Sequence, residues 1–132
     1  MFFDMEQSGT KSILIVDDER DILTVIEQML EELNMTVDSF TDPKKALESF
    51  RINPTKYDLI ISDFRMPQMS GLDFIYNIRQ LNPTVNVVVM SAFDPTKGEI
   101  DSAKSQLRVS EIITKPFNFA QFLNVVRRNL GP

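Results

Sequence analysis

Five polar side chains stand at the ends of short apolar runs in this sequence. They are Asp17, Asp18, Asp63, Ser91 and Lys115. Clustered carboxylates repel one another unless a cation or a lysine compensates their charge. Carboxylate oxygens suit a hard divalent cation such as Mg²⁺, which keeps several of its waters. A carboxylate beside a metal, an ammonium group and a hydroxyl is suited to phosphoryl transfer, with an aspartate as the nucleophile.

The run that ends at Asp63 predicts a buried strand. Leu59-Ile60-Ile61-Ser62 is too short for an ordinary helix, and polar residues flank it. Asp63 then lies at the carboxyl end of the strand, the edge where open α/β sheets bind their ligands. Taken alone, each of the five side chains has a simpler explanation as a helix cap, a turn residue or a solvated charge. The prediction of a site depends on their coincidence at strand ends.

Strands and helices alternate along the chain. Strands are predicted at residues 12–16, 36–40, 59–63, 85–90 and 112–114. Helical spacing of apolar residues predicts helices at residues 20–33, 43–52, 71–81 and 119–130. A further helix, of poorer quality, is predicted to begin at about residue 94. This alternation predicts an α/β fold with a parallel sheet covered on both faces, and the first, third and fourth strands are apolar enough for its centre. Right-handed crossovers bring every strand-to-helix loop to one edge of that sheet.

Polar residues mark where the helices begin. Asp18 is the predicted N-cap of the first helix, and Thr41 or Asp42 that of the second, where Pro43 stands in the first turn. The third helix is expected to open at Ser70.

Composition narrows the classes of function. With 132 residues, the chain suits one domain, predicted at residues 11–132 behind an N-terminal extension at 1–10. It has no cysteine and no histidine, so a Ser-His-Asp triad, a His-ligated zinc site and a histidine base are excluded. Lack of cysteine fits a cytoplasmic protein, and neither a signal peptide nor a membrane span is expected. The net charge is −5 and no basic run exceeds a pair, so direct nucleic-acid binding is not expected.

Four stretches, in order and at strand ends, resemble the receiver domain of two-component response regulators. The matching stretches are Ile13-Leu14-Ile15-Val16-Asp17-Asp18-Glu19, Asp63-Phe64-Arg65-Met66-Pro67-Gln68-Met69-Ser70-Gly71, Ser91-Ala92 and Lys115-Pro116-Phe117. The resemblance spans about residues 11–130. It implies a flavodoxin-like, doubly wound (βα)5 fold with a five-stranded parallel sheet of order 2-1-3-4-5.

The resemblance also implies roles for individual residues. Asp63 would be the phosphoacceptor, with Lys115 pairing with the phosphoryl group and Ser91 hydrogen-bonding it. Asp18, Asp63 and the backbone carbonyl of Arg65 would ligate Mg²⁺, with Asp17 acting through a bound water. The Lys115-Pro116 peptide bond is expected to be cis.

The same resemblance implies partners and a mode of action. The resemblance implies that the phosphoryl group comes from a phosphohistidine on a sensor histidine kinase or a histidine phosphotransfer protein. The absence of histidine from this chain fits an acceptor that cannot supply that group itself. The modified protein would regulate an effector that the sequence does not identify, as a monomer or a weak phosphorylation-dependent dimer. It would not be an enzyme beyond weak self-catalysed phosphotransfer and autodephosphorylation.

Three features depart from the family pattern. Ile112 stands where most receiver domains have Tyr or Phe, and an isoleucine has no ring to rotate inward on phosphorylation. Residues 94–110 are atypical, which predicts a short, shifted or mobile fourth helix. Arg65 and Phe93 are expected to border the path of the hydrolytic water and to slow autodephosphorylation.

Two other functions follow from these departures and from the chemistry. One is a receiver-like interaction module with weak or lost switching, suggested by Ile112. The other is an aspartate-nucleophile phosphohydrolase, which needs a second carboxylate two residues after the nucleophile. That position is Arg65 after Asp63, and Glu19 after Asp17 stands in a different context. Neither aspartate provides the expected Asp-x-Asp-x-Thr pattern, so the hydrolase is disfavoured.

Overall fold

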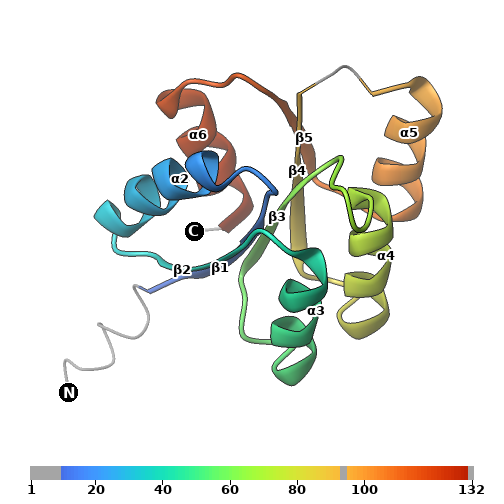
Figure 1. The fold of residues 1–132 in the computed structure, drawn as a ribbon, viewed down its shortest axis with the longest axis horizontal. Coiled ribbons are helices and arrows are strands. Elements are labelled where there is room, and N and C mark those ends of the chain that lie inside the picture. Colours follow the sequence, from blue (N-terminus) through green and yellow to red (C-terminus); the bar gives the residue numbers. More distant parts are fainter. Residues whose placement is uncertain (1–9, 93–94, 131–132) are drawn as a thin grey trace.

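The computed structural model describes residues 10–92 and 95–130, which form one α/β domain (Figure 1). In chain order the elements are β1 (Ser12–Val16), α2 (Arg20–Glu32), β2 (Thr36–Phe40), α3 (Pro43–Ile52), β3 (Leu59–Asp63), α4 (Gly71–Leu81), β4 (Asn86–Ser91), α5 (Lys97–Asp101), the π-helical η1 (Ser102–Gln106), β5 (Glu111–Thr114) and α6 (Phe119–Leu130). The five strands are parallel and their order is β2-β1-β3-β4-β5. The predicted fold class and strand order are confirmed. Among these helices none is both long and apolar enough to cross a bilayer.

Helices cover both faces of the sheet, as Figure 1 shows. Alternate residues of each strand point to opposite faces, so β1 sends Leu14 and Val16 to one hydrophobic cluster and Ile13 and Ile15 to the other. The first cluster packs against α3, α4 and Ala103 of η1, and the second against α2 and α6. The sheet is therefore apolar on both sides, which explains the uninterrupted apolar runs of the sequence.

Strand β3 lies in the middle of the sheet and carries Asp63 as its last residue. It pairs with β1 on one side and β4 on the other, and all five of its residues are buried. Asp63 lies opposite Met90 of β4. The predicted central positions of the first, third and fourth strands are confirmed. Their burial fixes the backbone from which the Asp63 side chain projects.

The helix caps agree with the sequence patterns at two of three sites. Asp42 accepts a hydrogen bond from the N–H of Lys44, and the Ser70 hydroxyl accepts one from Asp73 N–H. The prediction for Asp18 is wrong: the N-cap of α2 is Glu19, and no side chain caps the helix there. Asp17 instead accepts from the Glu19 N–H at 2.9 Å. The side chain that binds a backbone N–H at the start of α2 is thus that of Asp17, not that of Asp18.

The fourth helical segment differs most from a regular helix. It begins at Lys97, where Thr96 and Glu99 form a capping box, and it turns π-helical after only five residues. Ala103 is the buried residue of this segment, whereas Ile100 and Leu107 are only partly buried. The prediction of a short, shifted helix is confirmed. Its expected start at Asp94, like Phe93 and residues 1–9 of the predicted extension, lies outside the described residues.

The end of that segment is fixed by Arg79 of α4. Its guanidinium donates to the carbonyls of Leu107 at 2.8 Å, Val85 at 2.6 Å and Arg108 at 3.2 Å. Arg108 has a φ of 57°, a left-handed conformation that costs energy in a residue with a side chain. The bonds to Leu107 and Arg108 hold this turn, and the bond to Val85 ties Arg79 to the residue before β4, so the segment is anchored where it meets β5.

Candidate phosphoacceptor site

The predicted side chains converge at the carboxyl edge of the sheet. Asp17 follows β1, Asp63 ends β3, Ser91 ends β4 and Lys115 follows β5. A cavity of about 200 Å³ opens here. Its lining residues are Asp18, Glu19, Asp63, Phe64, Arg65, Ser91, Ala92 and Lys115. Asp17 lies buried beneath it, in contact with Lys115. The structure therefore brings together residues that are separated by up to 98 positions in the chain.

Lys115 is the cation at the centre of the site. Its Nζ lies 2.7 Å from Asp17 Oδ2, 3.4 Å from Asp63 Oδ1 and 3.5 Å from Glu19 Oε1. Only 9% of the Lys115 side chain is exposed. Burial by itself lowers the pKa of the Lys115 ammonium, but the hydrogen bond to Asp17 and the charges of Asp17 and Asp63 outweigh burial and raise that pKa. Lys115 therefore stays charged over the physiological pH range.

Two carboxylates of the site, Asp63 and Asp17, have raised pKa values. Burial, followed by the charge of Asp17, raises the pKa of Asp63 from 3.8 to about 6, although Lys115 and the Phe64 N–H favour its ionised form. Burial also raises the pKa of Asp17, against its hydrogen bonds from Lys115 and Glu19 N–H. Burial is thus the main reason why these two carboxylates ionise less readily, and Lys115 offsets its effect only in part.

The acidic cluster fits a hard divalent cation. Asp17, Asp18 and Asp63 each offer a carboxylate oxygen within 4.8 Å of the others, with Asp17 and Asp63 buried and Asp18 exposed. Oxygen ligands that reach solvent on one side match Mg²⁺, which binds through a few carboxylates and retains water. Both Asp17 oxygens are already engaged, one by Lys115 and one by Glu19 N–H. The fourth predicted ligand residue, Arg65, lines the same cavity.

Backbone contacts fix the position of Asp63. The Phe64 N–H donates to Met90 O at 2.8 Å and to Asp63 Oδ1 at 3.0 Å. Gly71 at the start of α4 packs so closely that an added Cβ would lie 2.3 Å from the carbonyl oxygen of Asp63. On the other side, the Lys115 N–H donates to Ser91 O at 2.7 Å, and the Lys115-Pro116 bond is cis as predicted.

Comparison with known proteins agrees with this geometry. Residues 13–127 match the response regulator receiver domain family. The chain belongs to this family. Receiver domains are signalling switches of two-component systems, and they bind Mg²⁺ at an acidic pocket.

Relatives and solved structures cover almost the whole receiver domain. Response regulator ArlR of Staphylococcus saprophyticus is 35% identical over 118 residues, which are 89% of this chain and 51% of that protein. The DNA-binding transcriptional regulator NtrC of Azospirillum brasilense is 34% identical over 91% of this chain and 24% of its own length. This chain thus spans between 14% and 51% of the first curated relatives that it matches. The signal receiver domain of an HD domain-containing protein from Pseudomonas fluorescens superimposes with a TM-score of 0.81 at 27% identity, covering 92% of this chain and 88% of that one.

Ile112 occupies the position of the usual aromatic residue in this receiver domain. It lies on β5 opposite Val89 of β4, and its partly buried side chain packs against the hydrophobic cluster under α3 and α4. An aliphatic side chain in that place has no ring to swing between an outward and an inward position. A movement that depends on a ring at position 112 is therefore not expected here.

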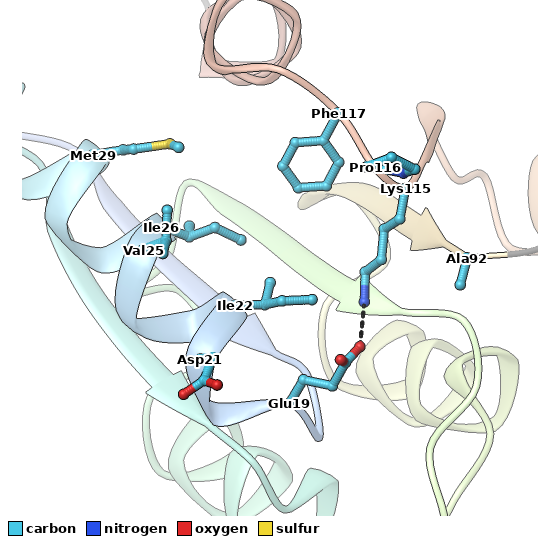
Figure 2. Close-up of a pocket in the computed structure, with 10 residues that line it drawn as sticks. All are labelled: Glu19, Asp21, Ile22, Val25, Ile26, Met29, Ala92, Lys115, Pro116 and Phe117. Atoms are coloured by element: carbon cyan, nitrogen blue, oxygen red, sulfur yellow. Dashed lines mark ion pairs between the residues drawn. The ribbon is translucent and has the colours of Figure 1, made fainter.

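The sequence patterns did not reveal a groove beside the site. It has a volume of about 580 Å³ and runs between α2 and the loop that joins β5 to α6. Figure 2 shows Ile22, Ile26 and Met29 of α2 on one side and Pro116 and Phe117 on the other. One signal in the sequence was the width of the apolar stripe on α2, which includes Val25, half exposed in the structure. Glu19, Ala92 and Lys115 line both the groove and the acidic cavity, and Glu19 was likewise not predicted as a site residue.

Proposed function

We propose that this receiver domain takes a phosphoryl group onto Asp63 from a phosphohistidine of a sensor kinase or phosphotransfer protein, and that the modified form regulates an effector. The observation that carries the proposal is the pair formed by the Asp63 carboxylate and Lys115 Nζ, which lie 3.4 Å apart and line a cavity, with the carboxylates of Asp17 and Asp18 beside them. The transfer needs an anionic nucleophile and compensating positive charge at one place, and this arrangement supplies both.

In the proposed reaction, a carboxylate oxygen of Asp63 attacks the phosphorus atom. The new P–O bond forms as the P–N bond to the donor imidazole breaks, and the imidazole leaves with the electron pair of that bond. Asp63 must be ionised to attack, which its pKa of about 6 allows at neutral pH. Lys115 would pair with an oxygen of the transferred group, and Ser91 would hydrogen-bond another. The product is an acyl phosphate with about two negative charges.

Asp18, Asp63 and the Arg65 carbonyl would hold Mg²⁺, and Asp17 would contribute through a water. When bound, the ion supplies positive charge to the oxygens of the transferring phosphoryl group. The engagement of both Asp17 oxygens within the protein supports an indirect role for that residue. Burial, followed by the charge of Asp17, raises the pKa of Asp63, and a bound cation would favour the ionised form against both.

The groove along α2 supports a protein as the phosphodonor. It is apolar, it reaches Glu19 and Lys115 at the edge of the site, and Val25 in its wall is 49% exposed. A helix of the donor that lies in this groove would bring a phosphohistidine to the cavity mouth. The cytoplasmic location, the lack of direct nucleic-acid binding and the monomeric or weakly dimeric state stay predictions.

The test is phosphorylation by a small donor. The protein is incubated with Mg²⁺ and acetyl phosphate, and its intact mass is measured with time. We expect the mass of one phosphoryl group to be added to the wild type and to Asp101→Asn, an exposed aspartate on α5, but not to Asp63→Asn. No gain in the wild type would favour the interaction module that Ile112 suggests. Rapid phosphate release without a stable adduct would favour a hydrolase.

A further inference from the structure

Arg65 connects the phosphoacceptor loop to the start of α5. It stands two residues after Asp63, and its Nη2 lies 3.3 Å and 3.2 Å from the two carboxylate oxygens of Glu99. The Arg65 side chain is 58% exposed and that of Glu99 is 27% exposed. Ion pairs as hydrated as this one are weak, so a stronger anion nearby can replace one partner.

Glu99 has a second role, because it also caps α5. Its Oε1 accepts a hydrogen bond from Thr96 N–H at 2.8 Å, and its own N–H donates to the Thr96 hydroxyl at 3.1 Å. No residue of α5 is buried, so polar contacts of this kind must hold the start of the helix. The other end of the segment is fixed by Arg79. The start of α5 is therefore the end that is free to respond to a change at Glu99.

Arg65 also borders the cavity in which a phosphoryl group on Asp63 would lie. It lines this cavity with Asp63, Ser91 and Lys115, whereas Glu99 does not line it. Phosphorylation would place about two negative charges there, against the single charge of Glu99. A guanidinium also binds phosphate oxygens through paired N–H groups, which strengthens the new contact.

We propose that Arg65 carries the signal to α5 by exchanging partners: it pairs with Glu99 in the unmodified protein and with the phosphoryl group on phosphorylated Asp63. The inference rests on the proposed function of Asp63. Release of Glu99 loosens the start of α5 and changes the surface at residues 96–101. This route needs no aromatic side chain, so it works with isoleucine at position 112.

The test uses fluoroberyllate, a phosphoryl analogue, in the presence of Mg²⁺, and measures its affinity by titration followed in amide NMR spectra. The variants are Arg65→Gln, Glu99→Gln and the double variant. Glutamine at position 99 keeps an oxygen that accepts from Thr96 N–H, so the capping box survives without the charge. Asp101→Asn is the control for removing a carboxylate from the same helix.

Partner exchange predicts opposite effects of the two single substitutions. Arg65→Gln removes a charge-assisted contact to the analogue, and we expect its affinity to fall about tenfold. Glu99→Gln removes the competitor for Arg65, and we expect affinity to rise about threefold. In the double variant the gain should vanish, leaving the affinity of Arg65→Gln alone. Asp101→Asn should match the wild type.

Other outcomes overturn the inference in distinguishable ways. If Glu99→Gln raises affinity equally with and without Arg65, Glu99 repels the analogue directly and no exchange occurs. If the wild type binds the analogue and neither single variant changes its affinity, Arg65 has no part in the response, and the function of Asp63 stands. If the wild type does not bind at all, the proposed function and the inference both fail.

A second measurement tests the effect on α5. Amide hydrogen exchange is compared with and without the analogue for residues 97–106. We expect exchange at the start of α5 to become faster on binding in the wild type. In Arg65→Gln it should already be fast and should not respond. Exchange that is unaffected by the analogue in the wild type would overturn the signalling role.

Discussion

Neutralising Asp63 should stabilise the protein in the absence of Mg²⁺. The folded-state pKa of about 6 lies above the ordinary 3.8, so folding makes ionisation of this carboxyl harder. The protonated group therefore adds stability that is fully present below pH 3.8 and is lost as pH rises through 6. Above that range the difference between the two pKa values corresponds to about 3 kcal/mol. Asp63→Asn removes this cost because its amide does not ionise.

The assay is urea unfolding of the wild type, Asp63→Asn and the control Asp101→Asn between pH 5 and 8 with a chelator. We expect the Asp63→Asn variant to be more stable by about 3 kcal/mol at pH 8 and by about half as much at pH 5. Asp101→Asn should stay close to the wild type throughout. A gain for Asp63→Asn that is the same at both pH values, or no gain at pH 8, would refute the electrostatic reasoning.

Three further predictions concern the residues around Asp63. Gly71→Ala should lower stability by about 1–3 kcal/mol and slow phosphorylation by acetyl phosphate, because its Cβ would meet the Asp63 carbonyl at 2.3 Å. Gly98→Ala is the matched control, since nothing lies within 4 Å of its added Cβ, and equal effects of both substitutions in denaturant unfolding would contradict the packing explanation. Lys115→Met should lower the free energy of unfolding by about 3 kcal/mol in the same assay, because the buried Asp17 carboxylate loses its partner at 2.7 Å. An unchanged midpoint would show that this ion pair does not contribute to stability. Arg65→Ala should shorten the lifetime of the acyl phosphate, followed by loss of the added mass with time, because the bulk and charge beside Asp63 are removed; an unchanged decay rate would argue against it.

Local patterns in the sequence were sufficient to predict the strands, the helices and the edge of the sheet where the site lies. The apolar runs that end at Asp17, Asp63 and Ser91 identified the three central strands, and the alternation of strands and helices placed Lys115 at the same edge of the sheet. These features depend on periodicity and on the handedness of crossovers, which act over short stretches of chain. The helix cap at Ser70 is of the same kind, because its partner is three residues away.

Which groups pair with which was decided by the tertiary structure. Asp17 was expected to act on the metal mainly through water, a role that stays a prediction. Its contacts with Lys115, 98 residues away, and with the Glu19 N–H were not predicted. Arg65 finds Glu99 across 34 residues, in a segment whose irregularity was predicted but whose contacts were not. Burial decides which of these carboxylates pairs with a protein donor. A carboxylate without access to water must accept from donors in the protein, whereas an exposed carboxylate can accept hydrogen bonds from water. Burial depends on the packing of the whole chain, so the sequence predicted most residues of the candidate site, whereas only the fold specified their partners.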